Sequence, residues 1–339
     1  MKVREGDLIE DNAGLIFDVK GLVHPPGKAV AFPRFIPDFP GSRLYKGQTY
    51  KKIYSLSARF KYLEQNFPGY LVQDPVFDET VCEIPMNAVK THYKPVEKLR
   101  KLRKSETLKD LERKVLQLTE MLREVASIRW NTVGISGSLL VGLHTAKSDL
   151  DPIVYGAENC WKVHSALKGM LQDETSHFKP YARKDLRVLF DFRSKDTVMS
   201  LEDFVKVEMR KVFQGKFMGT DYFIRFVKNW SQVNEKYGDV RYKNCGYARI
   251  KATIADDSES IFTPCKYDVE NVTVIEGSKL QPILEIASFR GRFCEQARKG
   301  EEVIAQGKVE RVVDNKEGRE HFRILLGNKP SDYMALTRV

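Results

Sequence analysis

The 339-residue sequence lacks the features that mark extracellular and membrane-spanning proteins. No stretch approaches the roughly 18 apolar residues of a membrane span, and the N-terminal residues lack the apolar core of a signal peptide. Its five cysteines are odd in number and never form a Cys-x-x-Cys pair, which argues against a disulfide framework or a zinc module. We therefore expect a soluble cytoplasmic protein with no membrane partner. The cysteines are Cys82, Cys160, Cys245, Cys265 and Cys294.

Positive charge, by contrast, is in excess. Lys and Arg total 56 against 46 Asp and Glu, which gives a formal net charge of +10. Basic residues gather between Lys94 and Lys104, and between Arg210 and Lys228 they alternate with Phe and Tyr. An excess of this kind favours a polyanionic partner, although a solvated helix face has the same composition. Apolar residues make up 42% of the chain, which excludes global disorder.

The residue pattern divides the chain into three modules. Residues 1–94 form a β-rich pattern with one helix over 56–66, which Pro68 ends. Residues 95–240 mix helical and strand patterns, and residues 241–339 return to a β-rich pattern with a hairpin around 314–318. We expect an α+β protein in which a central core is flanked by two β-rich modules.

Hydrophobic periodicity predicts the elements of the central module. Apolar residues three and four positions apart predict a helix over 107–128, which leads into a short strand over 132–136. The segment 186–192 satisfies both the helical and the strand period, so both interpretations stay open there. The other expected elements are helices over 157–172 and 201–213 and a strand over 221–227.

The stretch from Gly134 to Asp151 contains the residues that phosphoryl chemistry needs. A strand ends at Gly137-Ser138, where glycine lets the backbone approach a ligand and free amides at a helix start favour a phosphate. Asp149 and Asp151 lie two residues apart beside an apolar run, so in a strand their carboxylates face one side. A hard divalent cation best relieves their repulsion. A phosphate cradle beside carboxylate-held metal indicates phosphoryl or nucleotidyl transfer.

This combination resembles the signature of the polymerase-beta-like nucleotidyltransferase superfamily, in which Gly-Ser precedes Asp-x-Asp on a strand. Ser148-Asp-Leu-Asp151 resembles the form seen in CCA-adding and minimal nucleotidyltransferases, and the whole chain is similar to an archaeal group of predicted nucleotidyltransferases. The resemblance implies that Gly137 and Ser138 hold the nucleotide phosphates. It also implies that Asp149 and Asp151 bind two Mg²⁺ ions, for which Mn²⁺ can substitute.

The sequence departs from the superfamily pattern at Pro152, which removes a backbone donor from an expected interior strand. The superfamily usually adds a third carboxylate from a later strand. Asp221 is the favoured residue because it opens the strand over 221–227, and Asp191 is its rival. The flanking cations Lys216 and Arg225 could balance the triphosphate charge. His144, on the expected connecting loop between Gly-Ser and Asp-x-Asp, is an ordinary polar loop residue unless it takes part in catalysis.

These residues predict a metal-dependent enzyme that moves a nucleoside monophosphate from a nucleoside triphosphate to an acceptor and releases pyrophosphate. The basic charge and the extra modules favour a nucleic-acid end as acceptor, RNA ahead of DNA. Ser288–Phe293 interleaves Arg290 and Arg292 with phenylalanines, which suits either a base-stacking surface or a strand with Phe inward. Transfer to a protein or small molecule, and a catalytically silent nucleic-acid-binding protein, stay as alternatives. Further candidate contacts are Lys98, Arg100 and Lys101.

Overall fold

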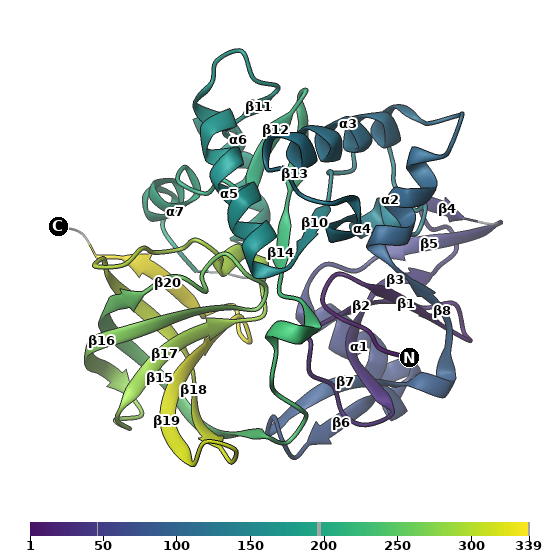
Figure 1. The fold of residues 1–339 in the computed structure, drawn as a ribbon. Coiled ribbons are helices and arrows are strands. Elements are labelled where there is room, and N and C mark those ends of the chain that lie inside the picture. The colour runs from purple at the N-terminus through teal and green to yellow at the C-terminus, as the bar shows by residue number, and fades with distance from the viewer. Residues whose placement is uncertain (46, 195–197, 338–339) are drawn as a thin grey trace. The chain divides into compact units, whose positions relative to one another are not determined.

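The computed structural model describes residues 1–45, 47–194 and 198–337 (Figure 1). The chain forms two compact units, and each is assembled from separate stretches. Both mix helices with sheets, in agreement with the expected α+β class. Unit 1 contains residues of the first and second predicted modules, and the module boundaries near 94 and 240 stay predictions. Unit 1 comprises Met1–Val72, Cys82–Pro180 and Val212–Asn234, and unit 2 comprises Gln73–Val81, Tyr181–Lys211 and Glu235–Val339.

The N-terminal sheet is built from β1 (Leu8–Asp11), β2 (Ile16–Val19), β3 (Lys28–Pro37), β4 (Arg43–Tyr45), β5 (Gln48–Lys52), β6 (Leu71–Asp74), β7 (Glu79–Pro85) and β8 (Val89–Tyr93). Its strand order is β4-β5-β3-β2-β1-β8, while β7 pairs with β3 and β6 with β7. Helix α1 (Leu56–Asn66) has the predicted bounds. It begins after Ser55, whose hydroxyl accepts a hydrogen bond from the Ala58 amide. Leu63 of α1 packs with buried strand residues into one core.

A small sheet carries the strand that follows the two aspartates. β10 (Pro152–Tyr155) lies between β9 (Val133–Ile135), which is antiparallel to it, and β14 (Arg225–Val227), which is parallel. Pro152 is the first residue of β10, a position at which a strand tolerates the missing donor. Pro152 is therefore compatible with a strand at this position.

The predicted strand over 221–227 is divided in two. Its first half, β13 (Thr220–Phe223), forms an antiparallel sheet with β12 (Gln214–Phe217) and β11 (Phe178–Lys179). The break comes at Ile224, because its amide donates to the Phe213 carbonyl outside either ladder. A bridge between Leu150 and Tyr222 still holds β13 beside the aspartates.

Besides α1, four further α-helices lie in the described part of unit 1. They are α2 (Pro95–Arg103), α3 (Asp110–Val125), α4 (Gly137–Leu140) and α5 (Ala157–Gln172). α3 and α5 match the predicted helices, and α3 buries Leu111, Val115, Leu118 and Leu122 at the predicted spacing. α4 is a single turn because the chain reverses at Gly142, where φ is +74°.

Unit 2 is built around a closed five-stranded barrel, drawn from green to yellow in Figure 1. Its strands are β15 (Val240–Asp256), β16 (Cys265–Gly277), β17 (Ile283–Ser288), β18 (Glu302–Asp314) and β19 (Arg319–Leu326). They follow the order β15-β16-β17-β19-β18, and β15 pairs again with β18 to close the barrel. Only β17 and β19 are parallel neighbours among these pairs.

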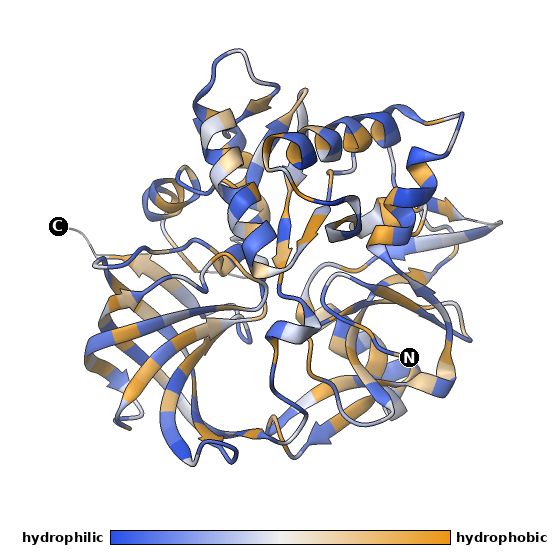
Figure 2. Cartoon of the chain, in the orientation of Figure 1, coloured by the Kyte–Doolittle hydropathy of each residue, from blue (hydrophilic) through white to orange (hydrophobic). Residues whose placement is uncertain are grey.

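The barrel strands alternate hydrophobic and polar residues, as Figure 2 shows, so one side of each strand fills the interior. β18 and β19 form the predicted hairpin around 314–318. A further strand, β20 (Tyr333–Leu336), pairs with β18 outside the closed ring.

Two helices precede the barrel within unit 2. α6 (Arg183–Arg193) contains the ambiguous segment 186–192 and buries Leu186, so the helical interpretation is correct. α7 (Leu201–Glu208) begins after its N-cap Ser200 but ends at Glu208 rather than near 213, because the chain then extends into β12. No helix in the described ranges is long and apolar enough to cross a bilayer.

Candidate functional site

The Gly-Ser turn lies directly against the second aspartate. A Cβ placed on Gly137 would stand 1.8 Å from the Oδ2 atom of Asp151, so only glycine fits at this position. Gly137 also has a φ of +61°, which favours glycine, and the Ser136 amide donates to the Asp151 carbonyl over 2.8 Å. The turn and the aspartates, separated by ten residues in sequence, therefore form one site.

Asp149 and Asp151 form a pair of half-buried carboxylates. They flank Leu150, which is fully buried, and so project to the opposite side of the strand. No residue in the described part of the chain hydrogen-bonds or ion-pairs with either carboxylate. Burial and the neighbouring charge of Asp149 raise the pKa of Asp151 to about 7, against the opposing charge of Lys52. The two carboxylates thus lie close enough for Asp149 to disfavour the charged form of Asp151.

Asp221 lies on the strand beside this pair. The Leu150 amide donates to the Asp221 carbonyl over 2.8 Å, and Leu150 forms a parallel bridge with Tyr222. Because Leu150 and Tyr222 are both buried, Asp149 and Asp221 project to the same opposite side. The Asp221 carboxylate accepts a hydrogen bond from Lys216 Nζ over 2.7 Å. The structure therefore brings the favoured third carboxylate next to the pair, with one cation already bound.

Asp191, the rival third carboxylate, lies on helix α6 of unit 2 and not on a strand. Its side chain is 63% exposed and stands 3.5 Å from Arg187 one helical turn away. This is the geometry of an ordinary surface ion pair.

Arg225 is held by acidic residues of the N-terminal part. Its guanidinium donates to Glu5 over 2.9 Å and stands 3.6 Å from Asp18. Burial opposes its charge, but Glu5 and Asp18 outweigh that effect and raise the pKa of Arg225 above its ordinary value. Arg225 therefore ties β14 to the N-terminal sheet, and its charge also acts on Asp151.

The structure adds cations that sequence analysis did not single out. Lys52, Arg34 and Arg43 come from neighbouring strands of the N-terminal sheet. Arg34 and Arg43 act electrostatically on Lys52, and Lys52 and Arg34 act on Asp151. Burial and the charge of Arg34 together lower the pKa of Lys52 to about 8, although Asp149 and Asp151 oppose this shift. Nothing in the local sequence distinguishes Lys52 from its exposed neighbour Lys51, so this cluster has no sequence signal.

Two further polar side chains of the motif are unsatisfied within the described residues. The Ser138 hydroxyl is buried and has no hydrogen-bond partner. Both ring nitrogens of His144 are likewise buried without a hydrogen-bond partner. Burial lowers the pKa of His144, although Glu112 opposes this shift. Ser138 is thus a donor without an acceptor at the turn where a phosphate is expected.

The donor set suits Mg²⁺ that arrives with a nucleotide. In the described ranges, no group of three or more His, Cys, Asp or Glu side chains is placed to hold a metal ion. Mg²⁺ commonly takes one or two carboxylates and completes its shell with substrate phosphates and water. The unpartnered oxygens of Asp149 and Asp151 fit that requirement.

The predicted nucleic-acid contacts occupy different environments. On α2, Arg100 and Lys101 are exposed, whereas Lys98 stands 3.4 Å from Glu112. The segment after β17 is a turn and not a strand, so the two phenylalanines do not share a face: Phe289 is 38% exposed and Phe293 is buried.

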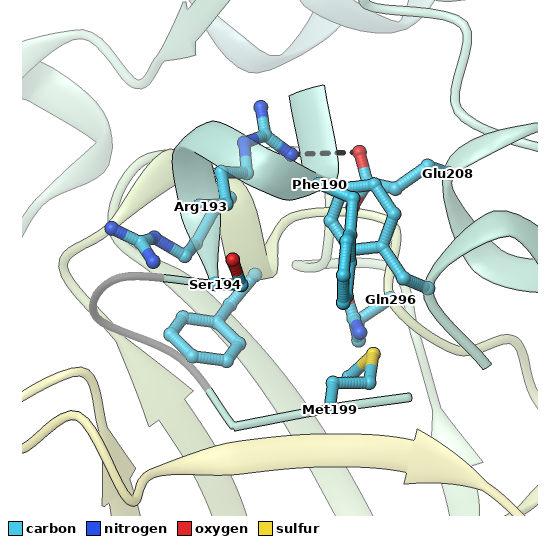
Figure 3. Close-up of a pocket in the computed structure, with 9 residues that line it drawn as sticks. Phe190, Arg193, Ser194, Met199, Glu208 and Gln296 are labelled. Carbon is cyan, nitrogen blue, oxygen red and sulfur yellow. Dashed lines mark hydrogen bonds and ion pairs between the residues drawn. The ribbon is translucent and has the colours of Figure 1, made fainter. Parts of the chain in front are cut away.

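Arg290 and Arg292 make local contacts at this turn. The Arg290 side chain donates to the Gly327 carbonyl over 3.5 Å, and the Arg292 carbonyl accepts from Lys211 Nζ over 2.6 Å. Arg292 also lines a cavity in unit 2 beside the ion pair of Arg193 and Glu208, which are 2.7 Å apart (Figure 3). This cavity measures about 20 Å³, room for a single water, and so excludes a nucleotide.

Comparisons with known proteins identify a relative of the chain but give no information on its function. No family model matches it, and no solved structure matches it. It is 33% identical over 336 residues to an uncharacterized protein, MJ1086, of Methanocaldococcus jannaschii, and the match covers 96% of each chain. Identity at this level over nearly the whole of both chains means that this protein belongs to the family of the uncharacterized protein MJ1086.

Proposed function

We propose that the protein is a metal-dependent nucleotidyltransferase. The observation that carries the proposal is the contact between Gly137 and Asp151, which sets a glycine turn directly against an unpartnered carboxylate pair. Nucleotidyl transfer needs this juxtaposition, because the phosphates must lie beside the charge that neutralises them while the acceptor attacks in line.

Each residue has a distinct role in this reaction. Asp149 and Asp151 would hold Mg²⁺, which supplies charge neutralisation at the reacting phosphate. The Ser138 hydroxyl and the turn at Gly137 would donate hydrogen bonds to phosphate oxygens. Asp221, on the same side of the neighbouring strand, would orient the acceptor hydroxyl and accept its proton. The α-phosphate bond to pyrophosphate breaks as the bond to the acceptor oxygen forms.

The barrel of unit 2 favours a nucleic-acid end as the acceptor. Its strand order, with the third and fifth strands parallel, is that of an OB-fold, an architecture that commonly binds oligonucleotides or oligosaccharides. Exposed Phe289 directly follows the third strand and could stack on a base. Because fold alone does not assign function, transfer to a protein or small molecule stays the alternative.

The test is incubation with each α-labelled nucleoside triphosphate and Mg²⁺, with and without total RNA. We expect label in RNA, and loss of that label by orders of magnitude in Asp149→Asn and Asp151→Asn. Asp191→Asn, which removes a surface carboxylate of unit 2, is the matched control and should retain activity. Label in protein would support the alternative acceptor. Full turnover by the double Asn variant, or binding of RNA without transfer of any nucleotide, would refute the proposed reaction.

A further inference from the structure

We propose that Arg34, Arg43 and Lys52 of the N-terminal sheet form the site that binds the triphosphate of the nucleotide substrate. This inference rests on the proposed function and names the part of the chain that holds the polyphosphate. It assigns a binding role to the N-terminal sheet, whose residues the sequence pattern left without one.

The cations that the sequence favoured already have acidic partners. Lys216 bonds Asp221 over 2.7 Å, and Arg225 bonds Glu5 over 2.9 Å with Asp18 close by. A polyphosphate is bound best by cations whose charge is not already balanced, because every existing ion pair would have to be broken or shared. Cations near the aspartates that are not held in a direct ion pair are therefore the better candidates for the triphosphate site.

The sheet order places the three cations on the adjacent strands β4, β5 and β3. Lys52 and Tyr50 lie two residues apart on β5 and so share one face. Tyr50 is paired with Arg43, and Lys52 with Phe35, in the two strand registers. This face therefore presents Lys52 and Arg43 together.

The same face packs on the chain just beyond the Gly-Ser turn. Phe35 and Tyr50 form one buried cluster with Leu140, Val141 and Leu143. Arg43 donates to the carbonyl of Leu143. Leu140, Val141 and Leu143 lie within five residues of Ser138, so Arg43 contacts the chain close to the turn that is expected to receive phosphate.

Among the described residues, neither Arg34 nor Lys52 is held in a direct ion pair. Within the described residues, neither side chain makes a hydrogen bond or an ion pair, so neither nitrogen group is within 4.0 Å of an Asp149 or Asp151 oxygen. Both lie over the ring of Tyr54, at 5.7 and 4.9 Å from its centroid. Their positive charges lower the pKa of Asp151 without direct contact. A metal-bound phosphate between the cations and the aspartates would interact favourably with both.

The experiment measures binding of inorganic tripolyphosphate to the full chain by calorimetry, with a chelator present to remove metal. Lys52→Gln and Arg34→Gln should each weaken binding at least about tenfold, since each removes one charge-assisted contact. Lys51→Gln is the matched control, because Lys51 is the exposed neighbour of Lys52 on the same strand. Lys52→Arg should keep affinity within about threefold of wild type. Thermal melting checks every variant, and Lys52→Met replaces Lys52→Gln if that variant does not fold.

Two outcomes would overturn the inference: no binding by the wild type, or equal affinities of the Lys51, Lys52 and Arg34 variants. The Asp149→Asn, Asp151→Asn double variant separates this result from the proposed function. It should bind metal-free tripolyphosphate as well as or better than wild type, because repulsion is removed, while losing transfer. Binding that depends on Lys52 and Arg34 in a protein that transfers no nucleotide would uphold the polyphosphate site and refute the reaction.

Discussion

At the scale of single residues, the carboxylate pair opposes folding while it serves the proposed chemistry. Asp149 and Asp151 are half-buried and unpartnered among the described residues, so their mutual repulsion acts in the folded protein and is relaxed in the unfolded chain. Residues kept for function commonly carry such a cost in stability.

Asp149→Asn should therefore raise the thermal midpoint of the metal-free protein at neutral pH. We expect a gain on the order of 1 kcal/mol, or roughly 2–4 °C. Mg²⁺ should raise the wild-type midpoint more than that of the variant, because only the wild type keeps both ligands. The measurement is calorimetry with chelator and with Mg²⁺. A variant less stable than wild type in chelator would contradict this account.

Asp221 is distinguished from Asp191 by its effect on catalysis. Asp221→Asn should impair transfer by at least about a hundredfold while nucleotide affinity changes little, because the proposed role of Asp221 is to accept the proton of the acceptor hydroxyl. Asp191→Asn should change neither quantity. Steady-state kinetics beside equilibrium nucleotide binding test this, and the reverse ranking of the two variants would invalidate the placement.

The sequence predicted the residues of the site only where chemistry and spacing coincide. The spacing of Gly137, Asp149 and Asp151 reflects a local strand-turn-strand path, so their association follows from the chain itself. The partners of Arg225 could not be predicted, because Glu5 and Asp18 lie more than 200 residues away in the chain. The position of Lys52 depends on long-range strand pairing in the same way.

At the scale of elements, periodicity predicted long helices well and ambiguous segments poorly. α1 follows from its N-cap, and α3 and α5 follow from their apolar stripes. The segment 186–192 has apolar residues compatible with both periods, and packing of Leu186 decides for the helix α6. The break at Ile224 depends on a hydrogen bond to Phe213, which no local pattern encodes.

The barrel contains an ion cluster of Glu285, His321 and Arg323 that should make its stability depend on pH in the acidic range. Burial would raise the pKa of Glu285 on β17, but His321 at 3.7 Å and Arg323 at 3.5 Å outweigh it and hold the pKa at about 2. The unfolded value is about 4.3, so this stabilisation is present above that pH and is lost as pH falls towards 2.

Glu285→Gln should consequently lower the thermal midpoint at pH 7 and converge with wild type near pH 2. The difference at pH 7 should be about 1–3 kcal/mol. Glu320, on β19, forms an exposed ion pair with Arg311. Glu320→Gln should therefore change the thermal midpoint little at any pH. If the thermal midpoints of Glu285→Gln and wild type change in parallel across this pH range, the cluster does not contribute to the pH dependence of stability.

At the scale of the whole molecule, excess positive charge should make binding of single-stranded RNA depend on salt. Four or five phosphate contacts would give a slope of about −3 in log affinity against log salt. Arg290→Ala with Arg292→Ala should flatten this slope by roughly one to two units. Phe289→Ala tests stacking cleanly because its side chain is exposed, whereas Phe293 is buried in the core. Salt-independent binding would instead favour a protein or small-molecule acceptor.

The discontinuous path of unit 1 has a consequence for protein synthesis. β10 pairs with β14, although the chain leaves unit 1 at Pro180 and returns only at Val212. A nascent chain that has passed Asp151 therefore holds its aspartates beside an unpaired strand edge until Val227 has left the ribosome. Because exposed strand edges invite misfolding, we expect the order of translation to favour a waiting state in which the N-terminal sheet is complete and the sheet of β9, β10 and β14 is not. The candidate site would be complete only after about two thirds of the chain has been made.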